Sequence, residues 1–224
     1  MKIGIIGAGH VGGALARRLS ALGHDISIAN SRGPDSLASL AKETGVKAVN
    51  VREAARGKDL VIVSIPVKAV RDLPRDLFAG DDHVVVVDTG NYYPQRDGRI
   101  AAIEDGTPES QWVSQQLGRP VVKAFNTIYS KHLLERAKGA DQSGRIALPV
   151  AGDDVNAKRV VLRLIDQLGF DGVDTGTLTE SWRQQPGTPV YGTDLGRDAA
   201  ERALTSASRT RLPEFRATGS VAPG

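Results

Sequence analysis

Several residue types that would point to particular functions are scarce or missing in this sequence. There is no cysteine among the 224 residues, which excludes disulfide bonds, thiolate zinc sites and cysteine nucleophiles. Aromatic residues make up only 4% of the chain, and the formal net charge is only +3. Because the basic residues are scattered and few aromatic side chains accompany them, the composition does not favour a nucleic-acid partner.

Long hydrophobic runs are also missing. No uninterrupted apolar stretch approaches the roughly 20 residues that a membrane helix needs, so no membrane partner is expected. Residues 1–7 run directly into a strand-like segment, without the charged and apolar regions of a signal peptide. Together with the lack of cysteine, these features predict a soluble cytoplasmic protein.

What is present is the composition of a globular α/β protein, with 40% apolar and 25% charged residues. Short, nearly continuous apolar runs rich in β-branched residues alternate with segments of helical periodicity. These runs are Ile3–Ile6, Ile26–Ala29, Val46–Val49, Leu60–Ile65 and Val84–Val87. The alternation predicts a doubly wound, mainly parallel sheet of the Rossmann type in a first domain, residues 1–128.

The same alternation continues in the second half of the chain. Further strands are expected at Pro120–Ala124, Arg145–Ala151 and Phe170–Asp174, and helices near Ser130–Ala137, after Asp153 or Asp154, and at Asp198–Leu212. We therefore expect a smaller C-terminal α/β lobe at residues 129–216 that continues the sheet, and a flexible tail at 217–224. Small residues on the last helix could pack within the molecule or form a homodimer.

The strongest motif is Gly7-Ala8-Gly9-His10-Val11-Gly12, which follows the first predicted strand and opens the first predicted helix. In such a turn Gly7 permits the tight bend, Gly9 lets the backbone approach a pyrophosphate, and Gly12 lets helix and strand pack closely. The motif predicts a dinucleotide site on the N–H groups of the helix N-terminus. His10 lies inside this loop, where it either contacts the ligand or is a solvated spacer.

The end of the second predicted strand indicates which dinucleotide binds. An NAD site usually has an acid there to hold the ribose 2′-hydroxyl, whereas this strand is followed by Asn30, Ser31 and Arg32. A carboxylate would repel a 2′-phosphate, while Ser31 and Arg32 can donate hydrogen bonds to it and Arg32 can neutralise it. The sequence therefore predicts NADP(H) as the cofactor.

Five motifs together resemble one protein family. They are the glycine-rich turn, Ala29-Asn30-Ser31-Arg32-Gly33-Pro34, Ser64-Ile65-Pro66, Asp88-Thr89-Gly90-Asn91-Tyr92-Tyr93 and Val121-Val122-Lys123-Ala124-Phe125-Asn126-Thr127. The set resembles the NADP oxidoreductases that depend on coenzyme F420, a deazaflavin, and their bacterial relatives. The last motif is also similar to the cytoplasmic reductase domain of six-transmembrane metalloreductases. The resemblance covers about residues 1–130.

The resemblance implies a role for each matching residue. Those expected to hold the pyrophosphate and the 2′-phosphate are Gly7, Gly9, His10, Val11, Gly12, Asn30, Ser31 and Arg32. Those expected around the nicotinamide and its ribose are Ser64, Ile65, Pro66, Asn91, Ala124, Phe125 and Asn126. The second group follows successive predicted strands, so its members should converge on one crevice. In residues 128–224 the resemblance identifies no acceptor site, although Trp182, Tyr191 and Phe215 could line one.

The resemblance implies hydride transfer between NADP(H) and a flavin or deazaflavin, and the lack of a recognisable catalytic set of side chains agrees with it. Direct transfer needs the two rings about 3–3.5 Å apart and no strong acid. We find no Ser/His/Asp set, paired carboxylates or metal-ligand spacing, and therefore predict neither a catalytic residue nor a metal site. A reductase of small imines or carbonyls, resembling pyrroline-5-carboxylate reductases, would need a proton donor such as His10, Lys123 or a tyrosine. A third possibility is an NADP-sensing protein without chemistry.

Overall fold

The sheet at the centre of the molecule is parallel and has six strands. A computed structural model describes residues 1–217. The six strands of this sheet are β1 (Lys2–Ile6), β2 (Asp25–Ala29), β3 (Lys47–Ala48), β4 (Leu60–Val63), β5 (Val85–Asp88) and β6 (Val122–Lys123). Two further strands, β7 (Ala147–Val150) and β8 (Asp171–Asp174), lie later in the chain. The order β3-β2-β1-β4-β5-β6 confirms the doubly wound α/β fold class. All six strands end at the same edge, where ligands of such sheets gather.

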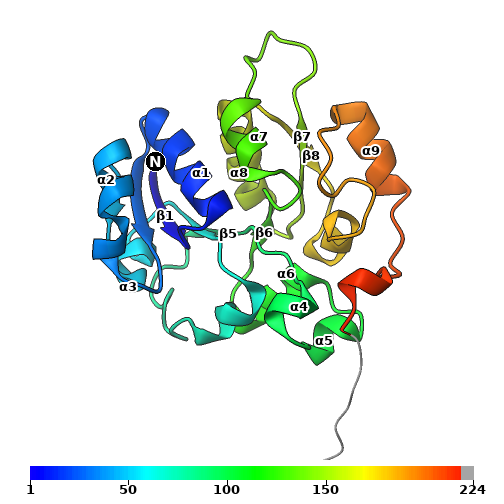
Figure 1. Ribbon diagram of the computed structural model, residues 1–224, viewed down its shortest axis with the longest axis horizontal. Coiled ribbons are helices and arrows are strands. Elements are labelled where there is room, and N and C mark those ends of the chain that lie inside the picture. Colours follow the sequence, from blue (N-terminus) through cyan, green and yellow to red (C-terminus); the bar gives the residue numbers. More distant parts are fainter. Residues whose placement is uncertain (218–224) are drawn as a thin grey trace, which may run out of the picture.

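Helices cover both faces of this sheet (Figure 1). The α-helices are α1 (His10–Ala21), α2 (Ala38–Thr44), α3 (Val51–Ala55), α4 (Pro94–Asp97), α5 (Ala101–Glu104), α6 (Glu109–Leu117), α7 (Ser130–Glu135), α8 (Val155–Gln167) and α9 (Arg197–Thr205). The described residues also form the 3-10 helices η1 (Pro34–Leu37), η2 (Val67–Asp72), η3 (Leu178–Gln184) and η4 (Pro213–Phe215). None of the described helices is long and apolar enough to cross a lipid bilayer.

The two sides of the core follow from the alternation of side chains along the strands. Ile3 and Ile5 of β1 point to the face covered by α1, α7 and α8, whereas Ile6 packs with α3 and α6 residues on the other face. Gly4 lies directly beneath α3, where a Cβ would come within 1.7 Å of the Ala54 carbonyl oxygen. Helix α3 therefore lies closer to β1 than any side chain at position 4 would allow.

The C-terminal lobe does not continue the sheet in the way the sequence predicts. Strands β7 and β8 form a separate, two-stranded parallel sheet. It touches the main sheet at one antiparallel bridge, where Lys123 N–H donates to the Ala151 oxygen (2.8 Å) and Ala151 N–H to the Lys123 oxygen (3.1 Å). Beyond Lys123, Phe125, with φ 62°, turns the backbone out of strand geometry, and pairing does not continue.

The last helix is shorter than predicted, and the chain beyond it returns to the first domain. Helix α9 ends at Thr205, and residues 206–217, here called the C-terminal strap, run back to α4, α5 and α6 (red in Figure 1). Gln95 Nε2 donates to the Glu214 oxygen (2.8 Å). Ala217 N–H donates to Glu104 Oε1 (2.9 Å). Apart from Ala217, the predicted tail at 217–224 lies outside the described residues.

The small-residue face of α9 packs within the lobe. Ala200 and Leu204 are buried in a cluster with Ala147 of β7, Val173 of β8 and Val190. This accounts for the apolar positions of the helix without a second copy of the chain, and homodimer formation stays a prediction.

A buried ion pair fastens the strap to the first domain. Glu109 is fully buried, and its Oε1 accepts a hydrogen bond from Arg211 Nη2 (2.9 Å) while Oε2 accepts one from the Tyr92 N–H (3.0 Å). Burial raises the pKa of the Glu109 carboxyl, and the charges of Lys123 and Arg211 act in the opposite direction. Arg211 therefore helps to keep a costly buried carboxylate ionised.

We expect Arg211→Met to destabilise the protein, and to do so more strongly at high pH than at low pH. A carboxyl whose pKa is raised by folding binds its proton more tightly in the folded protein. The free energy of unfolding therefore falls as pH rises from the unfolded-state pKa towards the folded-state pKa. Without Arg211 the folded-state pKa of Glu109 rises further, so the loss should reach about 3–5 kcal/mol at about pH 8 and be smaller at about pH 5.

Denaturant unfolding at the two pH values measures this difference. Arg216→Met, which removes an exposed arginine of the same strap, is the matched control and should change stability little at either pH. Equal losses for Arg211→Met at both pH values would contradict a role for Arg211 in the ionisation of Glu109.

Candidate functional site

The glycine-rich turn joins β1 to α1, and two of its glycines are required by the fold itself. Gly7 has φ +110°, and a Cβ there would lie 2.1 Å from the Ser64 carbonyl oxygen. A Cβ on Gly12 would lie 2.0 Å from the Gly7 oxygen. The turn, the first helical turn and the end of β4 thus touch through their backbones, as the motif predicts.

Gly9 differs, because nothing in the chain itself requires a glycine there. Its φ is −74°, and a Cβ would meet no atom within 4 Å. It is the N-cap of α1, a 12-residue helix whose first turn receives no side-chain cap hydrogen bond. A helix N-terminus with free N–H groups beside open space fits a pyrophosphate. His10 is exposed next to it, whereas Val11 packs against the core.

A cleft of about 790 Å³ opens at this edge of the sheet. The structure brings these predicted residues together in its lining: Gly7, Gly9, Asn30, Ser31, Arg32, Ser64, Ile65 and Pro66. It is also lined by residues that no motif singles out, including Asn50, Val51, Asp72, Leu73 and Pro74. Asn50 and Val51 come just after β3, so position at a strand end is the signal that could have found them, whereas Asp72, Leu73 and Pro74 lie at the end of η2.

The turn after β2 is organised by Asn30. Asn30 Oδ1 accepts a hydrogen bond from the Arg32 N–H (2.9 Å), and Asn30 Nδ2 donates to Ser36 Oγ (2.8 Å). Ser31 and Arg32 are left exposed at the mouth of the cleft. Among the described residues, no carboxylate lies within ion-pair distance of Arg32. Asn30 therefore fixes the shape of the loop, while Ser31 and Arg32 present a hydroxyl group and a positive charge to the cleft.

At the other end of the strand edge, the predicted residues Asn91 and Asn126 are directly paired. Asn126 Nδ2 donates to Asn91 Oδ1 (2.9 Å), and Asn91 Nδ2 donates to the Asn126 carbonyl oxygen (3.0 Å). Gln184 of η3 fixes the pair, since its Nε2 donates to Asn126 Oδ1 (2.9 Å) and its carbonyl oxygen accepts from Asn126 Nδ2 (2.7 Å). Sequence reasoning missed Gln184, which lies 58 residues away along the chain.

The predicted residues Ala124 and Phe125 lie beneath this pair and are both buried. Phe125 has φ 62°, in the left-handed region that residues other than glycine rarely adopt. Such a conformation costs on the order of 1–3 kcal/mol and persists only where surrounding contacts fix it, often at a functional site. It turns the chain sharply enough to bring Asn126 back over the end of β5.

A buried lysine underlies the loop that carries Asn91. Lys123 is fully buried, and its Nζ donates to Asp88 Oδ2 (3.0 Å) and to the Gly90 carbonyl oxygen. Asp88 also accepts from Ser110 Oγ (2.7 Å) and from the Gly90 N–H (2.8 Å). The Lys123 side chain is therefore directed to the interior and not to solvent. It holds residues 88–91 in place through its contacts with Asp88 and Gly90.

Two tyrosines meet beside Asn91. The hydroxyl groups of Tyr93 and Tyr191 are in hydrogen-bond contact, and Asn91 Nδ2 lies 3.5 Å from the Tyr191 oxygen. Burial, followed by the contact with Tyr93, raises the pKa of Tyr191. The Phe215 ring of the strap packs against Tyr93 with its centroid 6.2 Å away. Of the three C-terminal aromatics considered above, Tyr191 and Phe215 thus approach this end of the sheet, whereas Trp182 stacks on Arg183.

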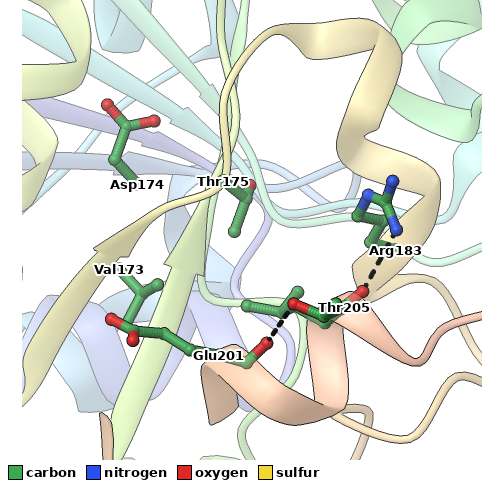
Figure 2. Close-up of a pocket in the computed structure, with 7 residues that line it drawn as sticks. Val173, Asp174, Thr175, Arg183, Glu201 and Thr205 are labelled. Atoms are coloured by element: carbon green, nitrogen blue, oxygen red, sulfur yellow. Dashed lines mark hydrogen bonds between the residues drawn. The ribbon is translucent and has the colours of Figure 1, made fainter. Parts of the chain in front are cut away.

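A second hollow of about 390 Å³ lies between β8, η3 and α9 (Figure 2). Two of its charged side chains are engaged elsewhere, since Asp174 pairs with Lys158 and Arg183 with Glu180. The hydrogen bonds within it, from Arg183 to the Leu204 oxygen and from Thr205 to the Glu201 oxygen, are contacts to the backbone of α9. It shares no lining residue with the cleft and does not extend the site.

Comparison with known proteins matches the first part of the chain to a named family. Residues 2–92 match the model described as "NADP oxidoreductase coenzyme F420-dependent". The protein YjhV of Escherichia coli (strain K12) is 43% identical over 79 residues, which are 34% of this chain. The matched part spans 58% of the length of YjhV.

Solved structures extend the likeness over most of the chain. The hypothetical protein SMa0349 from Sinorhizobium meliloti is 35% identical, with a TM-score of 0.77 over 88% of this chain and 96% of that one. A protein from Arthrobacter sp. FB24, proposed to be an F420-dependent NADP reductase, is 24% identical, with a TM-score of 0.66 over 81% of this chain and 87% of that one. At that identity the second likeness shows the fold alone. The resemblance found in the sequence is thus confirmed over residues 2–92, which match the family of NADP oxidoreductases described as coenzyme F420-dependent, and the chain is an oxidoreductase.

Proposed function

We propose that this protein binds NADP(H) along the strand edge and exchanges a hydride between it and a flavin or deazaflavin acceptor. The observation that carries the proposal is Gly9, whose missing side chain leaves open space above a free helix N-terminus although the fold does not require it. The family match to a coenzyme F420-dependent oxidoreductase supports the acceptor class.

The direction of the bound dinucleotide follows from the order of the strands. Arg32 after β2 marks one end and would neutralise a 2′-phosphate, so the adenosine half lies there. The helix N-terminus after β1 would bind the pyrophosphate, and Ser64 to Pro66 after β4 would border the second ribose. The nicotinamide then reaches the ends of β5 and β6, where Asn91 and Asn126 are paired.

When bound, NADPH supplies a hydride from its dihydronicotinamide ring. The chain's own residues orient and shield the ring: the amide pair fixes the shape of the crevice, and buried Ala124 and Phe125 exclude water beneath it. The negative charge that the acceptor gains can be held by its own ring nitrogens or oxygens. This agrees with the lack of a nucleophile or paired carboxylates beside the amide pair among residues 1–217.

We expect Gly9→Val to abolish binding of both NADPH and NADH while the protein stays folded. The valine side chain would extend into the space above the helix N-terminus, where a Cβ meets no atom of the chain within 4 Å. Loss of the N-cap glycine should cost only about 1 kcal/mol of stability. Isothermal titration measures the affinity, and circular dichroism the fold. Near-normal affinity in a folded variant would remove the pyrophosphate assignment.

We expect Arg32→Glu to weaken NADPH binding roughly 10- to 150-fold and NADH binding far less, because a charge-assisted hydrogen bond is worth about 1.5–3 kcal/mol. Arg56→Glu, an exposed charge reversal after α3 that does not line the cleft, is the matched control. Dissociation constants for both nucleotides should be compared in each variant. Equal losses of both in Arg32→Glu would be incompatible with a 2′-phosphate site at Arg32.

The acceptor class is tested by NADPH oxidation, followed at about 340 nm, with riboflavin, FMN, FAD or coenzyme F420 added, and with NADH as the control dinucleotide. Turnover that depends on one of these acceptors and prefers NADPH is the expected result. Oxidation only with a small imine or carbonyl compound would favour the pyrroline-5-carboxylate reductase-like alternative. Tight NADPH binding without oxidation by any acceptor would favour an NADP-sensing protein.

A further inference from the structure

The amide pair at the nicotinamide end has no hydrogen left to offer an acceptor. Both N–H groups of Asn126 are used, on Asn91 Oδ1 and on the Gln184 carbonyl oxygen. Both N–H groups of Asn91 are also directed inside the protein, to the Asn126 carbonyl oxygen and to the Tyr191 hydroxyl. An acceptor that gains negative charge here must therefore find its hydrogen-bond donor elsewhere.

One of the two hydroxyl hydrogens of Tyr93 and Tyr191 is not used in the contact between them. Each hydroxyl carries a single hydrogen, and the contact between Tyr93 and Tyr191 uses one of the two. The oxygen of Tyr191 is approached by Asn91 Nδ2 as well, so two donors can fill its lone pairs when Tyr93 is the donor in the tyrosine contact. In this arrangement the O–H of Tyr191 is left unpartnered among the described residues, and accepting two hydrogen bonds makes it a stronger donor.

Both tyrosines are held by contacts that fix their positions. Tyr191 N–H donates to the Thr188 oxygen and Gly192 N–H donates to the Thr127 oxygen, one residue beyond Asn126, both at 3.0 Å. Tyr93 N–H donates to Asp97 Oδ2 (3.0 Å), and its ring lies between Phe215 and the guanidinium of Arg96. Tyr191 is thus fixed from the C-terminal lobe, and Tyr93 from the first domain together with the strap.

We propose that Tyr191 is a catalytic residue that donates a hydrogen bond to the nitrogen or oxygen atom of the acceptor that becomes negative when the hydride arrives. The proposal rests on the hydride transfer proposed above. The hydride leaves the dihydronicotinamide with its electron pair and forms the new bond on the acceptor. The acceptor's displaced π pair moves to the heteroatom, where the Tyr191 O–H meets it, and water later supplies the proton that remains there.

Tyr93 is a positioning residue in this scheme, because its O–H directs the Tyr191 hydrogen outward. Burial is the main cause of the raised pKa of Tyr191, so the phenol keeps its hydrogen and can act as a donor rather than as a base. The ligand class that fits is a planar ring whose hydride-accepting atom is conjugated to a nitrogen or oxygen.

The test compares two variants, Tyr191→Phe and Tyr93→Phe. The control is Tyr129→Phe, which removes the hydroxyl group of a neighbouring tyrosine that is 59% exposed. The probe is riboflavin. Its affinity is measured by fluorescence quenching with NADP present in excess, and its reduction by NADPH is measured separately. Circular dichroism shows whether each variant is folded, and the NADPH affinity shows whether it still binds the dinucleotide.

We expect Tyr191→Phe to lower kcat at least about tenfold and to weaken riboflavin binding about 2- to 10-fold, the effect of one hydrogen bond, with NADPH affinity unchanged. Tyr93→Phe should lower kcat less and leave riboflavin affinity nearly unchanged, and Tyr129→Phe should behave as the unmodified protein. Equal kinetics and affinity in Tyr191→Phe and the unmodified protein would overturn the inference alone. If the unmodified protein reduces FMN, FAD or coenzyme F420 but not riboflavin, the same comparison is made with the acceptor that it reduces. If it binds NADPH but reduces none of the four, the proposed acceptor class is wrong and the inference falls with it.

Discussion

The ion pair between Lys123 and Asp88 is the contact on which the end of the candidate site at β5 and β6 depends. Both charges are withdrawn from water, which is favourable only where each is fully hydrogen-bonded, and here Ser110 and Gly90 complete the set. The backbone of Lys123 makes the bridge to Ala151 that joins the second lobe to the main sheet. One residue therefore holds β5, the loop to Asn91 and the C-terminal lobe in a fixed relation.

The parts of this architecture that the sequence predicts are those set by neighbours along the chain. The strands, the doubly wound order and the turn from Gly7 to Gly12 each follow from a short local pattern, and the structure contains all of them. The burial of Lys123 is different, because its partner Asp88 lies 35 residues away and nothing near position 123 signals it. The same holds for Gln184 and for the ion pair of Arg211 with Glu109, which are 58 and 102 residues from their partners.

This difference divides the site into two halves with different origins. The half at β1, β2 and β4 is built within residues 1–74, and the family model matches residues 2–92. The half at β5 and β6 needs Gln184 and Tyr191 from the second lobe and Phe215 from the strap. The dinucleotide half can therefore be recognised from local motifs, whereas the half that would meet the acceptor is visible only in the folded chain.

The left-handed conformation of Phe125 shows why the second lobe is needed for the site to exist. The conformation is unfavourable by itself, and it directs the Asn126 amide into a buried position where unpaired polar groups are costly. Gln184 removes that cost by accepting and donating hydrogen bonds with the same amide, and it is itself anchored on the Pro149 oxygen of β7. The turn that pairs Asn126 with Asn91 is thus stabilised from outside the first domain, so the C-terminal lobe shapes the end of the candidate site at β5 and β6.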